Sequence, residues 1–287
     1  MTSIRPRRSV LYMPGSNARA IEKAKTLAAD TLILDLEDAV APDSKTLARE
    51  QVTAAVKARG FGKREVAIRI NALSTPWGAD DLEAAIAAKP DAVLVPKISA
   101  ASDVAAVDAR LGEAEIALWA MIETPISILN LAAIAAAGGR LACFVMGTND
   151  LVKEFRGIHT PDRQNLAAAL TLSVAAARAH GLAILDGVYN DIQNAEGFEG
   201  ACAQGRAFGF DGKTLIHPSQ IAPANATFAP GAAEVDDPRK IIAAFDLPKN
   251  RSKGAIALDG RMVERLHADI ARRTVALADA IAELESA

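Results

Sequence analysis

The sequence predicts a parallel (β/α)8 barrel, the TIM-barrel class, within residues 1–223, followed by a C-terminal helical extension at 224–287. Short apolar runs alternate along the chain with stretches of helical period. The runs are almost continuously apolar, as expected of strands that are covered on both faces. Eight strand–helix units of this kind favour a closed barrel. An open, doubly wound sheet is the alternative, because periodicity alone does not show closure.

The predicted elements follow one another with short connections. The strands are expected at 9–13, 32–36, 66–70, 92–95, 117–122, 141–146, 183–185 and 210–216. The helices are expected at 18–29, 44–59, 79–88, 103–111, 126–137, 165–180 and 191–205. Gly60, Gly138 and Gly181 follow helix ends, where glycine is favoured.

The pattern changes after Pro223. Residues 224–260 are rich in turn formers and charged segments, and an amphipathic helix is expected at about 261–284. This tail is predicted to be an extension or lid that packs on the barrel or on a neighbouring subunit. Helical appendages on barrels often dock on a neighbour, so the extension favours a homo-oligomer.

Bulk properties exclude several classes of protein. A net charge of −3 gives no reason to expect nucleic acid or an anionic membrane as partner. No apolar stretch reaches the roughly 18 to 20 residues of a membrane span, and the basic start lacks the apolar core of a signal peptide. We therefore expect a cytoplasmic protein. Cys143 and Cys202 are expected to be buried free thiols rather than a disulfide.

Two acidic residues follow predicted strands directly. Glu123 comes after the apolar run 117–122, and Asp150 comes shortly after the run 141–146. Barrel enzymes build their active sites at the carboxyl ends of the strands. Mg²⁺ prefers oxygen ligands and commonly takes one or two carboxylates, which leaves positions for a chelating 2-oxo acid. The alternative interpretation is that both residues cap helices.

Other charged residues are predicted at the same rim. Arg69 ends the third strand and could hold a carboxylate or stabilise an enolate, or it could form a structural ion pair with Asp35 or Glu37. Glu37 and Asp38 follow the second strand and are expected to orient metal-bound water and Arg69. Lys97 is expected to pair with these acids rather than to form a Schiff base.

Two further segments could reach a ligand. The segment that begins at Tyr12 leads out of the first strand, and Arg19 and Lys23 follow at helical spacing. Such a loop and helix start could hold a phosphate. A solvated basic face is the alternative. His217 ends the eighth strand, where a structural hydrogen bond is favoured over catalysis.

Six segments in order carry a resemblance that covers nearly the whole chain. They are RSVLYMPG (8–15), LDLEDAV (34–40), RIN (69–71), VPK (95–97), IETP (122–125) and IHP (216–218). Together they resemble the citrate lyase β-subunit-like family of the HpcH/HpaI aldolase superfamily, which includes malyl-CoA lyases. The resemblance implies a magnesium-dependent barrel that cleaves or forms a carbon–carbon bond beside a thioester carbonyl.

The resemblance also implies roles for individual residues. Glu123 and Asp150 fall on the metal ligands of the family, with Glu123 also near the substrate, and Arg69 falls on the arginine that holds the oxo-acid portion. The positions that fall on acyl-CoA contacts in some members are Tyr12, Arg19, Lys23, Ile216 and His217.

The chain differs from the family at the residue that is expected to act as the general acid. Related lyases carry a Gly-x-Met-Ile/Val-Asp motif whose aspartate, often lent by a neighbouring subunit, transfers the proton. Here residues 260–264 read GRMVE, so Glu264 replaces that aspartate with a side chain one methylene longer. A misplacement of about 1 Å can cost on the order of a hundredfold in rate. Asp259 is a nearby substitute, although Asp-Gly is also a common turn.

The leading expectation is a Mg²⁺-dependent lyase that splits a malyl-CoA-type 3-hydroxyacyl thioester into a 2-oxo acid and an acyl-CoA, or catalyses the reverse condensation. The alternatives are a (3S)-malyl-CoA thioesterase, a citryl-ACP lyase β subunit, a catalytically silent CoA-ester-binding barrel and a 2-oxo acid aldolase that needs no CoA. The expected partners are acyl-CoA, a 2-oxo acid and further copies of the chain, as a trimer or hexamer.

Overall fold

The computed structural model describes residues 4–286, which divide into two compact units. One unit is Arg7–Phe228, and the other comprises residues 229–286 together with the short segment at 4–6. The expected boundary at 223 falls inside helix α10 (Ile221–Phe228). Pro223 is tolerated there because the first turn of a helix needs no backbone N–H donor.

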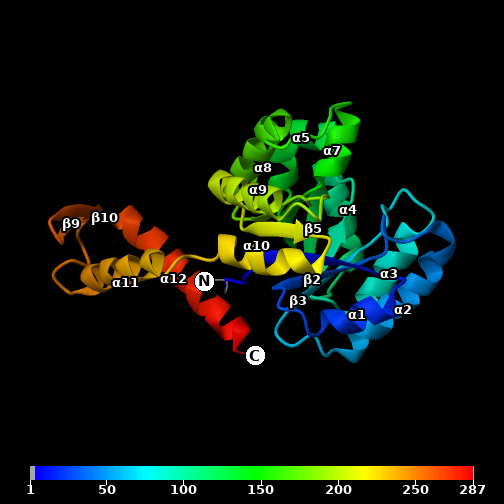
Figure 1. Ribbon diagram of the computed structural model, residues 1–287, viewed down its shortest axis with the longest axis horizontal. Helices are drawn as coiled ribbons and strands as arrows, with labels where there is room; N and C mark the ends of the chain where they lie inside the picture. The colour runs from blue at the N-terminus through cyan, green and yellow to red at the C-terminus, as the bar shows by residue number, and fades with distance from the viewer. Residues whose placement is uncertain (1–3, 287) are drawn as a thin grey trace. The chain divides into compact units, whose positions relative to one another are not determined.

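Eight parallel strands form a closed barrel in the first unit (Figure 1). The barrel closes where β1 pairs with β8, with Ser9 opposite Lys213 and Leu11 opposite Leu215. Closure confirms the predicted fold and excludes the open sheet. The strands are β1 Ser9–Pro14, β2 Thr31–Asp35, β3 Glu65–Arg69, β4 Ala92–Val95, β5 Ala117–Ile122, β6 Leu141–Met146, β7 Ala183–Asp186 and β8 Gly212–Leu215.

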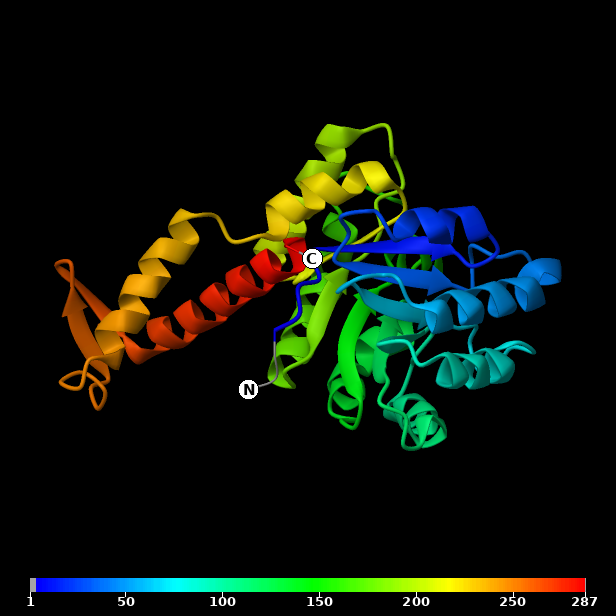
Figure 2. The ribbon, with the colours of Figure 1, turned by 90° about the horizontal axis from the view of Figure 1, so that it is seen from below.

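Helices surround the outside of the strands, as Figure 2 shows. Short 3₁₀ turns, η1 to η3, lead into three of them. The α-helices are α1 Ala18–Ala24, α2 Lys45–Ala58, α3 Gly78–Ala88, α4 Ala101–Leu111, α5 Pro125–Leu129, α6 Leu131–Ala135, α7 Thr148–Glu154, α8 Ala167–Ala179, α9 Ala195–Phe208 and α10. The 3₁₀ turns are η1 Pro42–Ser44, η2 Gln164–Leu166 and η3 Pro218–Gln220.

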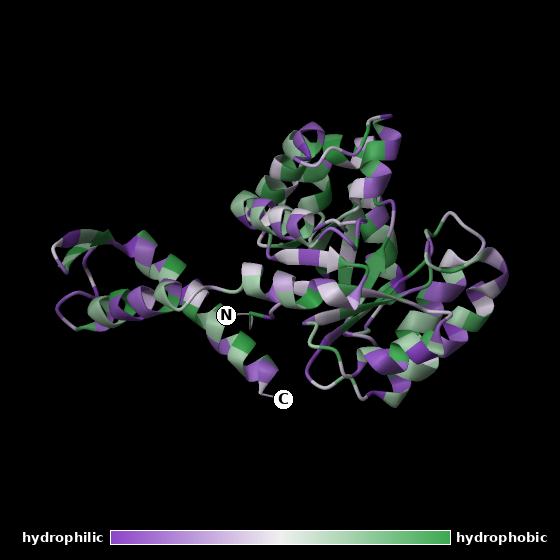
Figure 3. Cartoon of the chain, in the orientation of Figure 1, coloured by the Kyte–Doolittle hydropathy of each residue, from purple (hydrophilic) through white to green (hydrophobic). Residues whose placement is uncertain are grey.

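The apolar side chains form two layers because successive residues of a strand point to opposite faces. A smaller cluster fills the barrel interior, and it includes Val10, Ile33, Ala67 and Trp119. A larger cluster lies between the strands and the helices. Figure 3 shows the strands mostly in the hydrophobic colour, while the outer helices carry both colours. This layering fixes which strand residues face the interior of the barrel.

Some element boundaries differ from the predicted ones. The helix expected at 126–137 is split into α5 and α6 at Asn130, whose side-chain amide donates to the Ser99 carbonyl at 2.9 Å. The first helix ends at Ala24 rather than at residue 29, and the Thr26 hydroxyl bonds the Lys23 carbonyl just beyond it. Such local hydrogen bonds compete with the helical ladder.

The C-terminal unit contains two helices and a hairpin, α11 (Ala233–Asp246), β9 (Ala255–Leu258), β10 (Arg261–Glu264) and α12 (Arg265–Glu285). The helix predicted from residue 261 is therefore wrong for its first turn, because residues 261–264 pair with β9. Asp259 and Gly260 form the hairpin turn with positive φ angles of 46° and 76°. Asp-Gly is a favoured pair for such a turn, so Asp259 has a structural role there.

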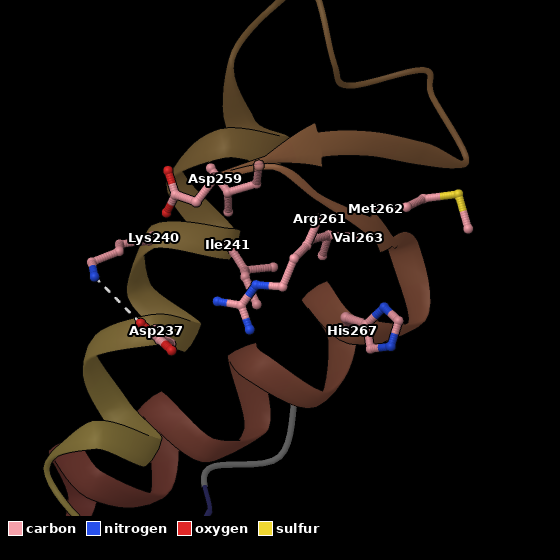
Figure 4. Close-up of a pocket in the computed structure, with 9 residues that line it drawn as sticks. Asp237, Lys240, Ile241, Asp259, Arg261, Met262, Val263 and His267 are labelled. Atoms are coloured by element: carbon pink, nitrogen blue, oxygen red, sulfur yellow. Dashed lines mark hydrogen bonds and ion pairs between the residues drawn. The ribbon is translucent and has the colours of Figure 1, made fainter.

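A cavity of about 220 Å³ lies within the C-terminal unit, as Figure 4 shows. Ile241, Leu258 and Val263 give it an apolar wall, and Lys240 is 3.3 Å from Asp237 at its edge. Arg261 and His267 also line it. None of the predicted barrel residues belongs to this cavity.

No helix among residues 4–286 has the length and apolar character needed to cross a membrane. Cys143 and Cys202 are both buried and unpaired, which confirms the predicted free thiols.

Candidate active site

Arg69 is fixed at the carboxyl end of β3, inside the barrel. Its Nε and Nη2 atoms each lie 2.6 Å from an oxygen of Asp35, the last residue of β2, in a bidentate pair. The Tyr12 ring of β1 packs against the guanidinium, with 4.7 Å between Cζ and the ring centroid. Burial alone would lower the pKa of Arg69, but Asp35 and the neighbouring acids outweigh burial and raise it. The ion pair considered from the sequence is therefore formed, and Nη1 is left facing the rim.

Glu37 faces that third nitrogen of Arg69. Its Oε2 lies 3.0 Å from Arg69 Nη1 but accepts no hydrogen bond of acceptable geometry from residues 4–286. Burial raises the pKa of Glu37 to about 8, with Arg69 acting against the shift and Asp38 adding to it. Asp38 itself is exposed, with Oδ2 3.6 Å from Arg69 Nη1. Glu37 is thus a carboxyl group whose proton affinity suits transfer near neutral pH.

Glu123 is buried immediately after β5, with only 1% of its surface exposed. Its Oε1 accepts the backbone N–H of Lys97 at 2.7 Å, whereas Oε2 has no hydrogen-bond partner in the described chain. Burial raises the pKa of Glu123, and Lys97 opposes that shift. A buried carboxylate oxygen without a partner is costly, so this atom is suited to coordinate a cation.

Asp150 lies in the first turn of α7, close to Glu123. Its side chain is partly exposed, and Oδ1 is 3.8 Å from Lys97 Nζ. The N-cap residues are Thr124 for α5 and Gly147 for α7. The capping interpretation is therefore wrong for Glu123, and Asp150 occupies the helix's first turn rather than its cap.

Lys97 links the acids of this rim. Its ammonium lies 3.7 Å from Glu37 Oε1, 3.7 Å from Glu123 Oε1 and 3.8 Å from Asp150 Oδ1. Burial would lower the pKa of Lys97, but these carboxylates raise it. A raised pKa disfavours the neutral amine that a Schiff base requires. The expected pairing of Lys97 with the acids is confirmed.

The donor set fits a hard divalent cation. Glu123 Oε2 is a buried oxygen without a hydrogen-bond partner in the described chain, and three carboxylates already surround one positive charge at Lys97 Nζ. Within residues 4–286 no group of three or more His, Cys, Asp or Glu side chains is arranged to hold a metal. Two carboxylates, Glu123 and Asp150, could serve as ligands only if water and substrate completed the shell, and their role as ligands stays a prediction.

Several residues predicted from the resemblance lie outside this cluster. Arg19 and Lys23 are exposed on α1. Ile216 and His217 follow β8, and His217 Nδ1 is 2.8 Å from Ser219 Oγ and accepts the Ser219 N–H at 3.2 Å. His217 therefore makes the structural hydrogen bond that the sequence favoured. Their contacts to an acyl-CoA stay predictions.

Glu264 belongs to the C-terminal unit. It is exposed at the start of α12, and its backbone N–H donates to His267 Nδ1 at 3.0 Å. Its role as a proton donor stays a prediction.

Gly147 was missed by the sequence argument. A Cβ at this position would lie 2.4 Å from Glu123 Cβ and 2.6 Å from Glu123 Oε2. Real Cβ atoms do not approach other atoms so closely, so only glycine fits without moving the carboxylate. The order Gly147, Thr148, Asn149, Asp150 after an apolar strand was the available signal.

Lys45 was also missed. Its buried ammonium donates to the carbonyls of Leu36 and Glu37 and to Asn71 Oδ1, each at 2.8 Å. Asp35 adds to this support by accepting the backbone N–H of Glu37 at 2.9 Å. The loop that presents Glu37 is therefore held from both sides.

The profile of the HpcH/HpaI aldolase/citrate lyase family matches residues 8–218, a stretch that includes every residue of this cluster. The chain belongs to this family of enzymes. The family and fold expected from the six segments are thereby confirmed.

The similar proteins have different activities. A (3S)-malyl-CoA thioesterase of Cereibacter sphaeroides is 50% identical over 277 residues, which is 96% of each chain. The citrate lyase subunit beta of Escherichia coli is 35% identical over 284 residues, covering 96% of this chain and 94% of that one. Among solved structures, CitE of Mycobacterium tuberculosis in complex with magnesium, acetoacetate and coenzyme A has a TM-score of 0.74 and 30% identity, covering 94% of this chain and 97% of that one.

Proposed function

We propose that this family member is a magnesium-dependent enzyme that hydrolyses the thioester of a malyl-CoA-type 3-hydroxyacyl-CoA. The observation that carries the proposal is the buried Glu123 carboxylate, with one oxygen held by the Lys97 N–H and the other without a hydrogen-bond partner in the described chain. The carboxylate of Asp150 lies nearby, so two oxygen ligands are available at the rim. Oxygen ligands of this kind suit Mg²⁺.

Hydrolysis is preferred over carbon–carbon cleavage for two reasons. The thioesterase of Cereibacter sphaeroides shares 50% of its residues with this chain, whereas the citrate lyase subunit shares 35%. In addition, Glu264 stands where related lyases have the aspartate that transfers a proton. The longer side chain supports a loss of carbon–carbon cleavage more than a loss of binding.

Each residue of the rim would have a separate role in hydrolysis. Arg69 presents Nη1, its nitrogen farthest from Asp35, to the carboxylate of the malyl group, because its other two nitrogens are held by Asp35. Glu37 accepts a proton from water as the water oxygen bonds to the thioester carbon. The C–S bond then breaks, and Glu37 returns the proton to the departing thiolate. A bound Mg²⁺ supplies Lewis acidity and orients the substrate's oxygen atoms.

Carbon–carbon lyase activity is the second candidate, since the same site resembles that of the lyases. In that reaction the substrate's 3-hydroxyl group loses its proton, the bond between C2 and C3 breaks, and the acetyl-thioester enolate takes up a proton. Glu264 would be the donor. A citryl-ACP lyase subunit and a silent CoA-ester-binding barrel would use the same rim residues. Measuring which thioester is turned over, if any, distinguishes these two from the proposed hydrolase.

The proposal extends to the assembly. The C-terminal unit would act as a lid that packs on the barrel or on a neighbouring subunit, and the protein would be a cytoplasmic homo-oligomer of three or six chains. Light scattering after size-exclusion chromatography measures the number of chains directly, and a monomer would contradict this part.

The metal requirement is tested by thiol release from malyl-CoA with Mg²⁺, with Mg²⁺ plus excess chelator, and with acetyl-CoA as the substrate control. We expect release only from malyl-CoA and only with free Mg²⁺. Glu123→Gln keeps the shape of the side chain but removes its charge, and it should lower kcat/KM by about a hundredfold or more. The matched control Glu154→Gln, at the exposed end of α7, should leave the rate unchanged. Release that continues in chelator would contradict the metal requirement.

A further inference from the structure

Lys97 contributes to the rim in two separable ways. Its backbone N–H donates to Glu123 Oε1 at 2.7 Å, and its backbone φ is +56°, a left-handed value uncommon for a residue with a side chain. Its ammonium lies 3.7 to 3.8 Å from the carboxylates of Glu37, Glu123 and Asp150. The first contact orients a carboxylate, whereas the second places one positive charge among three acidic side chains.

The ammonium is held loosely compared with the backbone. The Lys97 side chain is 47% exposed, whereas that of Glu123 is 1% exposed. All three ion-pair distances exceed the 2.7 to 2.9 Å typical of a charge-assisted hydrogen bond. Half-exposed pairs of this kind contribute little each and are easily broken. The ammonium can therefore move into water while the backbone bond to Glu123 stays in place.

We propose that the Lys97 ammonium is a displaceable internal counter-ion that occupies the carboxylate cluster when no metal is bound and competes with a divalent cation for it. This inference rests on the proposed function, because it assumes that Glu123 and Asp150 are the metal ligands. A divalent ion at these carboxylates repels the nearby ammonium, so we expect the ammonium to move into water as the ion binds. Lys97 then lowers the affinity for metal while keeping the empty acidic site stable.

The test is the dissociation constant of Mg²⁺, measured by calorimetry on chelator-treated, dialysed protein. Lys97→Met keeps the stem and removes the charge, and Lys97→Gly removes the side chain while suiting the positive φ. Both variants should bind Mg²⁺ about tenfold more tightly than the wild type. Without metal they should unfold at a lower temperature, and saturating Mg²⁺ should raise that temperature by more than it does in the wild type.

Lys89 offers a matched control. It is an exposed lysine with a similar φ of +59° at the end of α3, and it precedes β4 at the other end of the barrel. Lys89→Met should leave the Mg²⁺ affinity unchanged. Glu123→Gln should abolish Mg²⁺ binding.

The outcomes separate this inference from the proposed function. Equal or weaker Mg²⁺ binding by both Lys97 variants, with binding still lost in Glu123→Gln, would overturn the Lys97 inference alone. Mg²⁺ binding that tightens in the Lys97 variants, in a protein that releases no thiol from malyl-CoA, would support the inference and overturn the proposed hydrolysis. Absence of Mg²⁺ binding in every variant and in the wild type would overturn both.

Discussion

At the scale of single residues, the site depends on charged side chains. Neighbouring groups hold some polar atoms of each side chain, and one further polar atom faces the rim. Arg69 gives two of its nitrogens to Asp35, and Glu123 gives one oxygen to a backbone N–H. Glu123 Oε2 has no hydrogen-bond partner in the described chain, and Arg69 Nη1 lies beside Glu37 Oε2 at 3.0 Å and Met121 Sδ at 3.7 Å. Fixed groups of this kind need little reorganisation during the reaction.

Gly147→Ala tests how closely the backbone approaches Glu123. The added Cβ would meet Glu123 Cβ at 2.4 Å, so the carboxylate must move. We expect Mg²⁺ affinity and thiol release to fall by about tenfold or more. Gly200→Ala is the matched control, because nothing lies within 4 Å of a Cβ on that residue of α9. Alanine should slightly stabilise that helix without changing the rate. Normal Mg²⁺ affinity in Gly147→Ala would refute the assigned contact.

The raised pKa of Glu37 predicts that the free energy of unfolding of the metal-free protein depends on pH. Its pKa is raised from 4.5 to about 8, chiefly by burial, so the folded state binds more protons than the unfolded state between these values. The stability from protonated Glu37 is complete below pH 4.5 and is lost as pH rises towards 8, at up to about 1.4 kcal/mol per pH unit.

Glu37→Gln removes the titrating carboxyl group, so this variant should not lose stability as pH rises in the way the wild type does. Urea unfolding in chelator from pH 5 to pH 8 should show the variant gaining stability relative to the wild type as pH rises. The exposed control Glu50→Gln should show no such trend. A constant difference between Glu37→Gln and wild type across this range would rule out a raised pKa.

At the scale of elements, β7, β8 and α9 are joined by a second buried charged network, centred on Asp186. Asp186 at the end of β7 lies 2.9 Å from Lys213 Nζ of β8 and 2.8 Å from Arg163, which precedes η2. Asp186 is fully buried and Lys213 is 1% exposed. The Arg163 Nε also donates to Gln204 of α9 at 2.7 Å. The network therefore ties the loop after α7 to the sheet.

Lys213→Met should destabilise the protein, because it removes one of the two cations that compensate the buried Asp186 carboxylate. We expect a loss of about 3 kcal/mol in the free energy of unfolding, measured in urea. Mg²⁺ affinity should be unchanged, since Lys213 does not contact Glu123 or Asp150. Lys57→Met, on the exposed face of α2, is the control. A loss below about 1 kcal/mol would show that Arg163 alone compensates Asp186.

The elements also show what the sequence can reveal. Most of the buried strands are almost continuously apolar and could be placed for that reason, along with the charged residues that end them. β8 (GKTL) is the exception, because it contains Lys213 and Thr214. The hairpin at 255–264 could not be predicted, because residues 261–264 continue the amphipathic pattern of α12. They form a strand only because they pair with β9. Asn130 split a predicted helix through a contact with Ser99, 31 positions away. Such distant contacts leave no local signal.

The same limit applies to the site. Glu123, Asp150, Arg69 and Glu37 could be found because each follows an apolar strand. Lys45 could not be found, because its role arises from contacts with residues distant in the chain. Gly147 stands in the run that leads to Asp150, but its close approach to Glu123 is a distance across the rim that the sequence does not show.

At the scale of the whole molecule, the balance between hydrolysis and carbon–carbon cleavage is expected to depend on Glu264 in the C-terminal unit. Glu264→Asp restores the family's motif and shortens the side chain by one methylene. We expect the ratio of glyoxylate to free thiol to rise by about tenfold, because a misplaced acid loses much of its effect. Glu264→Gln should not raise this ratio. An unchanged ratio in Glu264→Asp would exclude side-chain length as the cause.

Under the proposed function, this barrel hydrolyses a malyl-CoA-type thioester with Mg²⁺. The most direct test follows glyoxylate and free thiol in parallel while the wild-type protein acts on malyl-CoA with Mg²⁺. Free thiol in step with malate, without glyoxylate and stopped by chelator, is the predicted result. Glyoxylate with acetyl-CoA and no free thiol would contradict hydrolysis and make the protein a carbon–carbon lyase.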